Sequence, residues 1–316
     1  MDKQKKTRAL VEAVLMATLV SIFTIVLIYI PILTPVIFLI PVPFMILGKR
    51  QGTHFTILSV IVWAMVIISL IGPIQTMFIV LFMGVSAIVM GYMMDKKYDA
   101  FKILVGGAIA ALLGLALSIT FVKLISGVDV INQVIEQMRM ATELQMKQMK
   151  MYKNMGMDLQ QMKELEERLE LSIEAMAMTI PAGMIIGSVF FAQINYVIAV
   201  RILKKIGTEI EGLPPLRYIR LPKNFFMGTV LIAVLTSITQ YMGIVNFETL
   251  VINEILIFRL IYFVQGLAVV SYFLNHFKIK KILRIFIYIL LILSGSGVFM
   301  IAVMGLIDVL FNLRKL

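Results

Sequence analysis

Long apolar runs, separated by short clusters of charged and polar residues, dominate this chain of 316 residues. A run of about 20 apolar residues is long enough to cross the hydrocarbon core of a bilayer as an α-helix. The runs that reach or approach this length predict spans at residues 9–30, 32–47, 56–71, 73–94, 103–125, 179–200, 225–242 and 255–274. We therefore expect an all-α, polytopic integral membrane protein with about eight or nine transmembrane helices.

Two of the apolar runs carry residues that break helices. The second run contains Pro35, Pro41 and Pro43, which predict a kinked or interrupted helix. A break at membrane depth is tolerated only where protein or a cavity surrounds the backbone. The last run, 285–310, has the sequence SGSG near its middle, so it is either one long tilted helix or a kinked re-entrant hairpin.

The basic clusters between the runs predict the topology. Lysines and arginines lie before the first run, between the second and third runs, and between the fourth and fifth. Cytosolic loops carry such an excess, so we expect the N-terminus in the cytosol. Five spans from a cytosolic start place residues 126–177 outside the cell, and the nearly balanced charge of this segment agrees with that side.

Residues 126–177 have an amphipathic rather than a purely apolar pattern. Apolar residues recur at helical spacing in two series, Ile131, Ile135, Met138, Met146 and Met149, and then Met162, Leu165, Leu169, Ile173 and Met176. Gly156 interrupts the pattern, and Asp158 with Gln161 forms a candidate capping box. The segment is therefore predicted to form an extracellular amphipathic helical hairpin.

The hairpin segment is also rich in methionine, and thioether sulfur is a soft ligand suited to Cu(I). No histidine lies near these methionines, and several of them continue the two apolar series. Methionine fills irregular gaps in apolar seams because its side chain is flexible. We interpret these residues as the seam of the hairpin and predict no metal site.

These patterns divide the chain into four parts. They are an N-terminal bundle of five spans at 1–125, the hairpin at 126–177, a sixth span at 178–205 that closes a six-span core, and a cytosolic loop with the C-terminal spans at 206–316. Prolines and basic residues in "LPPLRYIRLPK" predict that the loop is structured and lies at the cytosolic surface.

Composition narrows the possible chemistry. The chain is 60% hydrophobic and 15% charged, contains no cysteine and has only two histidines. It contains no phosphate-binding loop, dinucleotide fingerprint or nucleophile elbow. The net charge of +11 comes from clusters between apolar runs, which indicates topology rather than binding to nucleic acid. We expect neither an enzyme nor a bound cofactor, and we expect the lipid bilayer as a partner.

Polar side chains at membrane depth are the candidate site residues, because such groups are costly there and are usually functional. Those that could bind a substrate are Gln193, Asn195, Gln240, Glu254 and Arg259. Gln193 and Asn195 are expected near the middle of the sixth span. The alternative for Glu254 and Arg259 is that they anchor the eighth span at the outer interface. Asn253 and Gln265 are further polar residues around that span.

Small residues repeat at every fourth position on two spans. The first span carries Ala9, Ala13 and Ala17, and the fifth carries Gly106, Ala110, Gly114 and Ser118. Rows of this kind let another helix approach closely. The first row is a candidate docking ridge for a partner subunit, and the alternative is that at least one row packs inside this chain.

Several segments together resemble a known family: "TRALVEAVLMATL", "PVPFMILGKRQG", "TIPAGMIIGSVFFAQINYVIAVRILKKIG", "LPPLRYIRLPKNF", "QGLAVVSYFLNHF" and "GLIDVLFNLRK". In this order they are similar to the YybS-like family of uncharacterised bacterial integral membrane proteins. The resemblance runs essentially from end to end. It implies a multi-pass protein of the bacterial cell membrane.

The N-terminal part is also similar to the S components of energy-coupling-factor transporters, which are six-helix, substrate-binding proteins with both ends in the cytosol. This similarity implies uptake of a small molecule, energised by partner ATPases through a transmembrane T subunit that docks on Ala9, Ala13 and Ala17. The alternative is a non-transporting membrane scaffold or signalling partner, in which the hairpin at 126–177 binds an extracellular protein.

Overall fold

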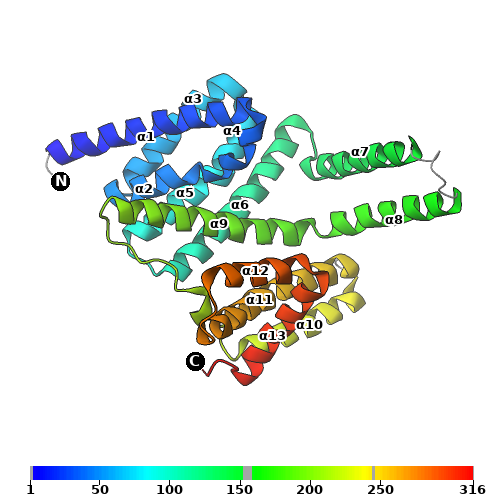
Figure 1. Ribbon diagram of the computed structural model, residues 1–316. Coiled ribbons are helices and arrows are strands. Elements are labelled where there is room, and N and C mark those ends of the chain that lie inside the picture. Colours follow the sequence, from blue (N-terminus) through cyan, green and yellow to red (C-terminus); the bar gives the residue numbers. More distant parts are fainter. Residues whose placement is uncertain (1–2, 152–158, 244–245, 316) are drawn as a thin grey trace. The chain divides into compact units, whose positions relative to one another are not determined.

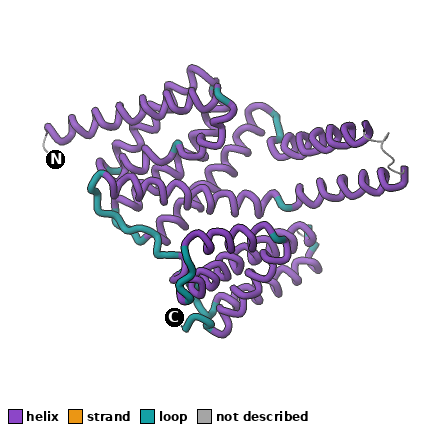
Figure 2. Tube along the Cα trace, viewed as in Figure 1, coloured by secondary structure: helices purple, strands orange, loops and turns teal. Residues whose placement is uncertain are grey.

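Helices make up nearly all of the protein (Figure 1). The computed structural model describes residues 3–151, 159–243 and 246–315, with side chains throughout except at 148–151, 159–163, 165 and 166. The described residues form helices and connecting loops and include no strand (Figure 2). The prediction of an all-α protein is therefore confirmed.

Eight helical stretches among the described residues are long and apolar enough to cross a membrane. They are α1 (Lys3–Tyr29), η1 (Pro31–Leu39) with α2 (Pro41–Gln51), α3 (Thr53–Ile71), α4 (Pro73–Ile79) with η2 (Val80–Gly84) and α5 (Val85–Asp95), α6 (Ala100–Ser126), α9 (Ile180–Lys205), α10 (Phe225–Met242) and α11 (Phe247–His276). Each of them contains or closely overlaps a predicted span. The prediction of a polytopic protein with eight or nine transmembrane helices is confirmed.

The remaining candidate is a bent pair, α12 (Lys281–Leu293) and α13 (Gly295–Phe311), whose axes meet at 104°. Ser294 lies between them with extended backbone angles, and its hydroxyl donates a hydrogen bond to the carbonyl oxygen of Leu291. The structure therefore shows a sharp kink instead of one long helix over residues 285–310, and the re-entrant arrangement in the membrane stays a prediction.

The prolines of the second span also act as expected. Residues Pro31–Leu39 form a 3-10 helix that contains Pro35, and an α-helix begins only at Pro41. Proline lacks the N–H group that an α-helix needs and crowds the preceding turn, so the chain takes the narrower helix here. The predicted interruption of this span is confirmed.

The fourth span contains a π-helical turn, η2, at the place where α6 approaches it most closely. Ser118 of α6 donates a hydrogen bond to the carbonyl oxygen of Phe78, 3.1 Å away. Gly114 lies so close to Leu81 that a side chain at this position would collide with the Leu81 carbonyl oxygen. The row of small residues on the fifth span therefore packs within this chain.

The alanine row of α1 is likewise covered by the chain itself. Ala9, Ala13 and Ala17 are at most 1% exposed. Ser59 of α3 donates a hydrogen bond to the carbonyl oxygen of Ala13 at 2.8 Å, which places α3 directly against this row. Docking of a partner on the three alanines stays a prediction, and it would require α1 to separate from α3.

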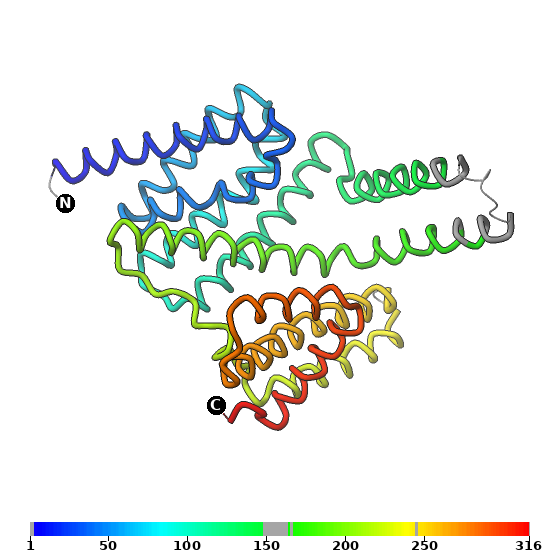
Figure 3. Tube along the Cα trace, viewed as in Figure 1, coloured from blue at the N-terminus to red at the C-terminus, as the bar shows by residue number. Residues whose placement is uncertain are grey.

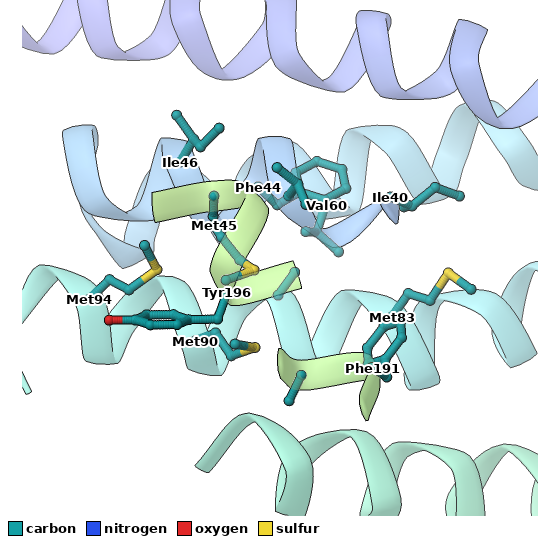
Figure 4. Close-up of a cluster of buried hydrophobic side chains, with 14 of the residues drawn as sticks. Ile40, Phe44, Met45, Ile46, Val60, Met83, Met90, Met94, Phe191 and Tyr196 are labelled. Atoms are coloured by element: carbon teal, nitrogen blue, oxygen red, sulfur yellow. The ribbon is translucent and has the colours of Figure 1, made fainter. Parts of the chain in front are cut away.

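The chain forms two compact units, an N-terminal unit (Met1–Glu174 and Gly183–Leu213) and a C-terminal unit (Ala175–Ala182 and Pro214–Leu316). The core of the N-terminal unit combines residues of α2, α3, α5 and α9, as Figure 4 shows for Phe44, Val60, Met90 and Tyr196. The sixth predicted span, α9, thus packs with the five that precede it.

The C-terminal unit has a smaller core around Tyr262, Ala302 and Val309. Two glycines let α11 and α13 approach at backbone distance, because a side chain on Gly266 would collide with the Ile301 carbonyl and one on Gly305 with the Tyr262 carbonyl. This unit is therefore tightly packed where its two main helices cross.

Two amphipathic helices, α7 (Val130–Met151) and α8 (Leu159–Met178), occupy most of the segment between α6 and α9 (Figure 3). Met146 and Ile173, one from each predicted apolar series, are 6% and 7% exposed and line the same cavity of about 350 Å³. Met176 of the second series is exposed. The extracellular side of the hairpin stays a prediction. Met149, Met162, Leu165, Gly156, Asp158 and Gln161 lie outside the residues whose side chains are described, as do Met151, Met155 and Met157 of the methionine-rich stretch considered for Cu(I).

Candidate functional site: an apolar cavity beside α9

A cavity of about 720 Å³ lies within the N-terminal unit, beside α9. Its wall comes from η1, α4, η2, α6 and α9 and includes five phenylalanines, Phe38, Phe78, Phe82, Phe190 and Phe191. Its volume is in the range of pockets that hold small organic ligands, roughly 300–1,000 Å³. Phe82 and Phe191 stack with ring centroids 4.7 Å apart, which fixes one part of the wall.

Local sequence explains why space remains here. Pro31 and Pro35 hold the second span in a thin 3-10 helix, and this segment supplies four residues of the wall. On α9, Gly183 and Gly187 present no side chain, and an added Cβ would meet nothing within 4 Å at either position. Phe190 and Ile194 are 45% and 49% exposed, so the cavity is open along α9.

Asn195 is the polar side chain that the sequence placed near the middle of the sixth span, and it belongs to the cavity wall. It is fully buried. Its Nδ2 donates hydrogen bonds to the carbonyl oxygens of Phe38 at 2.9 Å and Phe191 at 2.8 Å. Its Oδ1 is buried with no hydrogen-bond partner.

Ser188 is a second polar residue of the wall, and sequence reasoning did not select it. It is 3% exposed, and its Oγ also lacks a hydrogen-bond partner. Ser188 and Asn195 are seven residues apart, which puts them on the same helix face about 10 Å apart along the axis. The seven-residue spacing from Asn195 is the signal in the sequence that could have identified Ser188.

The other candidate residues do not join this cavity. Gln193 is on α9 but is exposed, because it lies two positions from Asn195 on a different face. Gln240 on α10 is exposed, and on α11 Arg259 is exposed while Glu254 is half-buried. The last three belong to the C-terminal unit. A role for these four residues in substrate binding stays a prediction.

The C-terminal unit contains a buried polar network of its own, centred on Arg314 and Asp308. The guanidinium of Arg314 contacts Asp308 Oδ2 at 2.9 Å and donates to the carbonyl oxygens of Arg217 and Ile219, both at 2.8 Å. Gln265 donates to the same carboxylate oxygen at 2.7 Å. Both charged side chains are at most 1% exposed. The network therefore ties the end of the chain to α11 and to the loop before α10.

Asn253, also in this unit, fills a break in helical hydrogen bonding. Its Oδ1 accepts from the Ala182 N–H at 2.6 Å, and its Nδ2 donates to the Met178 carbonyl oxygen at 2.7 Å. In an uninterrupted α-helix these two backbone groups would bond to each other. The asparagine amide thus stands between α8 and α9, next to Pro181.

The helices, their length and their apolar composition define the class: this is a polytopic, all-α membrane protein with a cavity inside one of its units. A family model described as "Predicted membrane protein (DUF2232)" matches residues 18–309, and the chain belongs to this family.

The chain is also similar to "Uncharacterized protein YybS" of Bacillus subtilis (strain 168). The identity is 24% over 316 residues, which cover 98% of this chain and 99% of that protein. No solved structure matches the chain. The resemblance to the YybS-like family is confirmed, and the similarity to S components stays a prediction.

Proposed function

We propose that this chain is a membrane-embedded binding protein for a small molecule, and that it acts as an S-component-like subunit for uptake energised by partner ATPases. The supporting observation is the cavity beside α9 and its two unpaired polar atoms, Asn195 Oδ1 and Ser188 Oγ. A buried polar atom without a partner costs about 1–3 kcal/mol. A ligand that pairs with either atom would remove that cost.

The proposed role is binding without chemistry. None of the residues that line the cavity is ionisable, so the wall offers no general acid and no general base that could activate the Ser188 hydroxyl as a nucleophile. Energy for transport would come from separate subunits, and the first contact with them is proposed on α1. Leu15, Leu19 and Ile22 follow one exposed face of this helix, opposite the covered alanines.

Occupancy of the cavity can be tested by filling it. Gly187→Leu places a side chain in the open space beside α9, and Gly228→Leu is the matched control, because it also adds a side chain where nothing lies within 4 Å, but on α10 in the other unit. Both proteins and the parent are purified in mild detergent, and small molecules that co-purify are identified by mass spectrometry. We expect one species to be retained by the parent and by Gly228→Leu but lost from Gly187→Leu. Equal recovery from all three would contradict binding at this cavity.

The coupling to ATPases needs its own test. Affinity purification of the tagged chain from its membrane, followed by identification of bound proteins, should recover a T subunit and ATPases. Recovery of neither, from cells in which the chain still binds its small molecule, would remove the uptake role and leave binding intact.

The second candidate is a membrane scaffold, and one observation favours it. Leu144 on α7 and Leu171 on α8 are 60% and 65% exposed in helices that also carry many charged residues. Exposed apolar residues on an amphipathic helix can bind a protein partner. Leu144→Ser with Leu171→Ser should abolish recovery of such a partner while leaving the cavity unchanged.

A further inference from the structure

The chemical class of the ligand follows from the cavity wall, and this inference rests on the binding role proposed above. The wall combines phenylalanine and aliphatic side chains with a single amide and a single hydroxyl. Burying a charged group without a paired charge is very costly, and the wall contains no ionisable residue. A ligand that enters this site is therefore neutral and mainly apolar.

The amide of Asn195 determines which polar group the ligand must carry. Both hydrogens of Nδ2 are engaged by carbonyl oxygens, those of Phe38 and Phe191. Turning the amide over would set Oδ1 against two other acceptors, so this orientation is the only one that satisfies the carbonyls. The atom left without a partner is Oδ1, which can only accept a hydrogen bond. The matching ligand group is a donor, and a ketone, quinone or ester oxygen does not meet this requirement.

Ser188 sets a second requirement at a known separation. Its hydroxyl can donate or accept, and it lies about 10 Å from Asn195 along the axis of α9. One small polar head cannot reach both side chains. Both oxygen atoms are shielded from solvent, so a ligand reaches them by displacing a neighbouring side chain of the wall.

We propose that the cavity binds a neutral, elongated, lipid-soluble alcohol, with a hydroxyl that donates to Asn195 Oδ1 and a second polar group near Ser188. The apolar body between the two groups lies against the phenylalanines. The apolar body has room there because Gly183 and Gly187 carry no side chain on the side of α9 that lines the cavity.

The test compares matched probes on the full-length protein in detergent micelles. Dodecan-1-ol, dodecyl methyl ether and decane-1,10-diol are each titrated against the parent protein, Ser188→Ala and Asn195→Leu. The partitioning of each probe into protein-free micelles is measured separately, because it differs between alcohol, ether and diol, and each corrected affinity is then expressed as a ratio to that of the ether. The parent should prefer dodecan-1-ol over its ether by about tenfold, as one hydrogen bond provides, and should bind the diol more tightly again.

The variants separate the two polar contacts. Asn195→Leu should lose the preference for alcohol over ether, and Ser188→Ala should keep that preference but lose the advantage of the diol. Because Asn195→Leu also removes the bond to Phe38, the Ser188→Ala result keeps the test valid if the first variant does not fold.

Two outcomes overturn different claims. Equal affinity of the parent for alcohol and ether would overturn the ligand class. If Gly187→Leu still releases a co-purifying molecule in that case, the cavity remains a binding site and only its assigned chemistry is wrong. If Gly187→Leu also has no effect, the proposed binding function itself fails.

Discussion

The two units of this chain place their unpaired buried polar atoms in different surroundings. In the N-terminal unit, Asn195 and Ser188 each keep an oxygen atom without a partner beside an open cavity. In the C-terminal unit, Asn253 is bonded at both ends of its amide, and the charge of Arg314 is paired with that of Asp308. Asp308 Oδ1 and Arg217 Nε are also buried without a partner there, but neither residue lines the cavity beside α9. An unpaired polar atom therefore indicates a ligand site only where it lies beside a cavity.

The largest effect is expected from breaking the paired charges of the C-terminal unit. Arg314→Met leaves Asp308 buried without its partner, which should cost about 3–5 kcal/mol of unfolding free energy. Combining it with Asp308→Leu should recover much of the loss, because the unpaired charge is then gone. Thermal unfolding in micelles measures both, with Lys315→Met, at an exposed neighbouring position, as the control. A single variant as stable as the control would show that the pair is not a structural element.

A smaller loss is expected at Asn253. Replacing it by alanine removes the partners of the Ala182 N–H and the Met178 carbonyl, and should cost about 1–3 kcal/mol while leaving binding at the cavity intact. Asn275→Ala, at the exposed end of the same helix, is the control for thermal unfolding. Loss of ligand with no loss of stability would reverse the roles assigned to the two asparagines.

Ser188→Ala should change stability least among the buried polar substitutions. The hydroxyl has no partner to lose, so unfolding free energy should stay constant or rise by up to about 1 kcal/mol. The control is Ser118→Ala, which removes a hydroxyl bonded to the Phe78 and Gly114 carbonyl oxygens and should be destabilising. If both serine variants lose equal stability, the distinction between satisfied and unsatisfied hydroxyls does not hold here.

The smallest effect is expected at Asp99, whose carboxylate belongs neither to the polar groups beside the cavity nor to the buried network of the C-terminal unit. The Lys102 side chain, followed by its backbone N–H, lowers the pKa of Asp99 below the ordinary value of 3.8. A lowered folded pKa means that the stabilisation is complete above the unfolded pKa and is lost as the pH falls through the folded value. Melting temperature should therefore not respond to this group between pH 8 and 5 and should fall slightly below about pH 4. Asp99→Asn should remove that acidic component; an unchanged acid profile would exclude the carboxylate as its source.

Much of the fold followed from run length and from proline. The spans were predictable because about 20 apolar residues have few other stable environments. The interruption of the second span was predictable because Pro35 cannot take part in an α-helix interior. The partner of the alanine row was not predictable, since small residues permit close approach without naming the helix that makes it.

The sequence predicted one of the two polar residues of the cavity wall and missed the other. The depth of Asn195 in its span identified it, whereas Ser188 was missed because serines in apolar helices commonly satisfy themselves on the preceding turn. Arg314 resembled an ordinary cytosolic basic residue after a final span. Its backbone partners lie 97 and 95 residues earlier in the chain, at Arg217 and Ile219, a pairing that no local pattern contains.

The amide of Asn253 also has a mechanical consequence. Where α8 and α9 meet, the Ala182 N–H does not donate to the Met178 carbonyl oxygen as it would in a continuous helix. The side-chain amide of Asn253 bonds to both groups instead. The junction between the two helices is therefore held by the two hydrogen bonds of Asn253, beside the backbone bond from Thr179 N–H to the Met176 carbonyl oxygen, and not by an unbroken helical ladder.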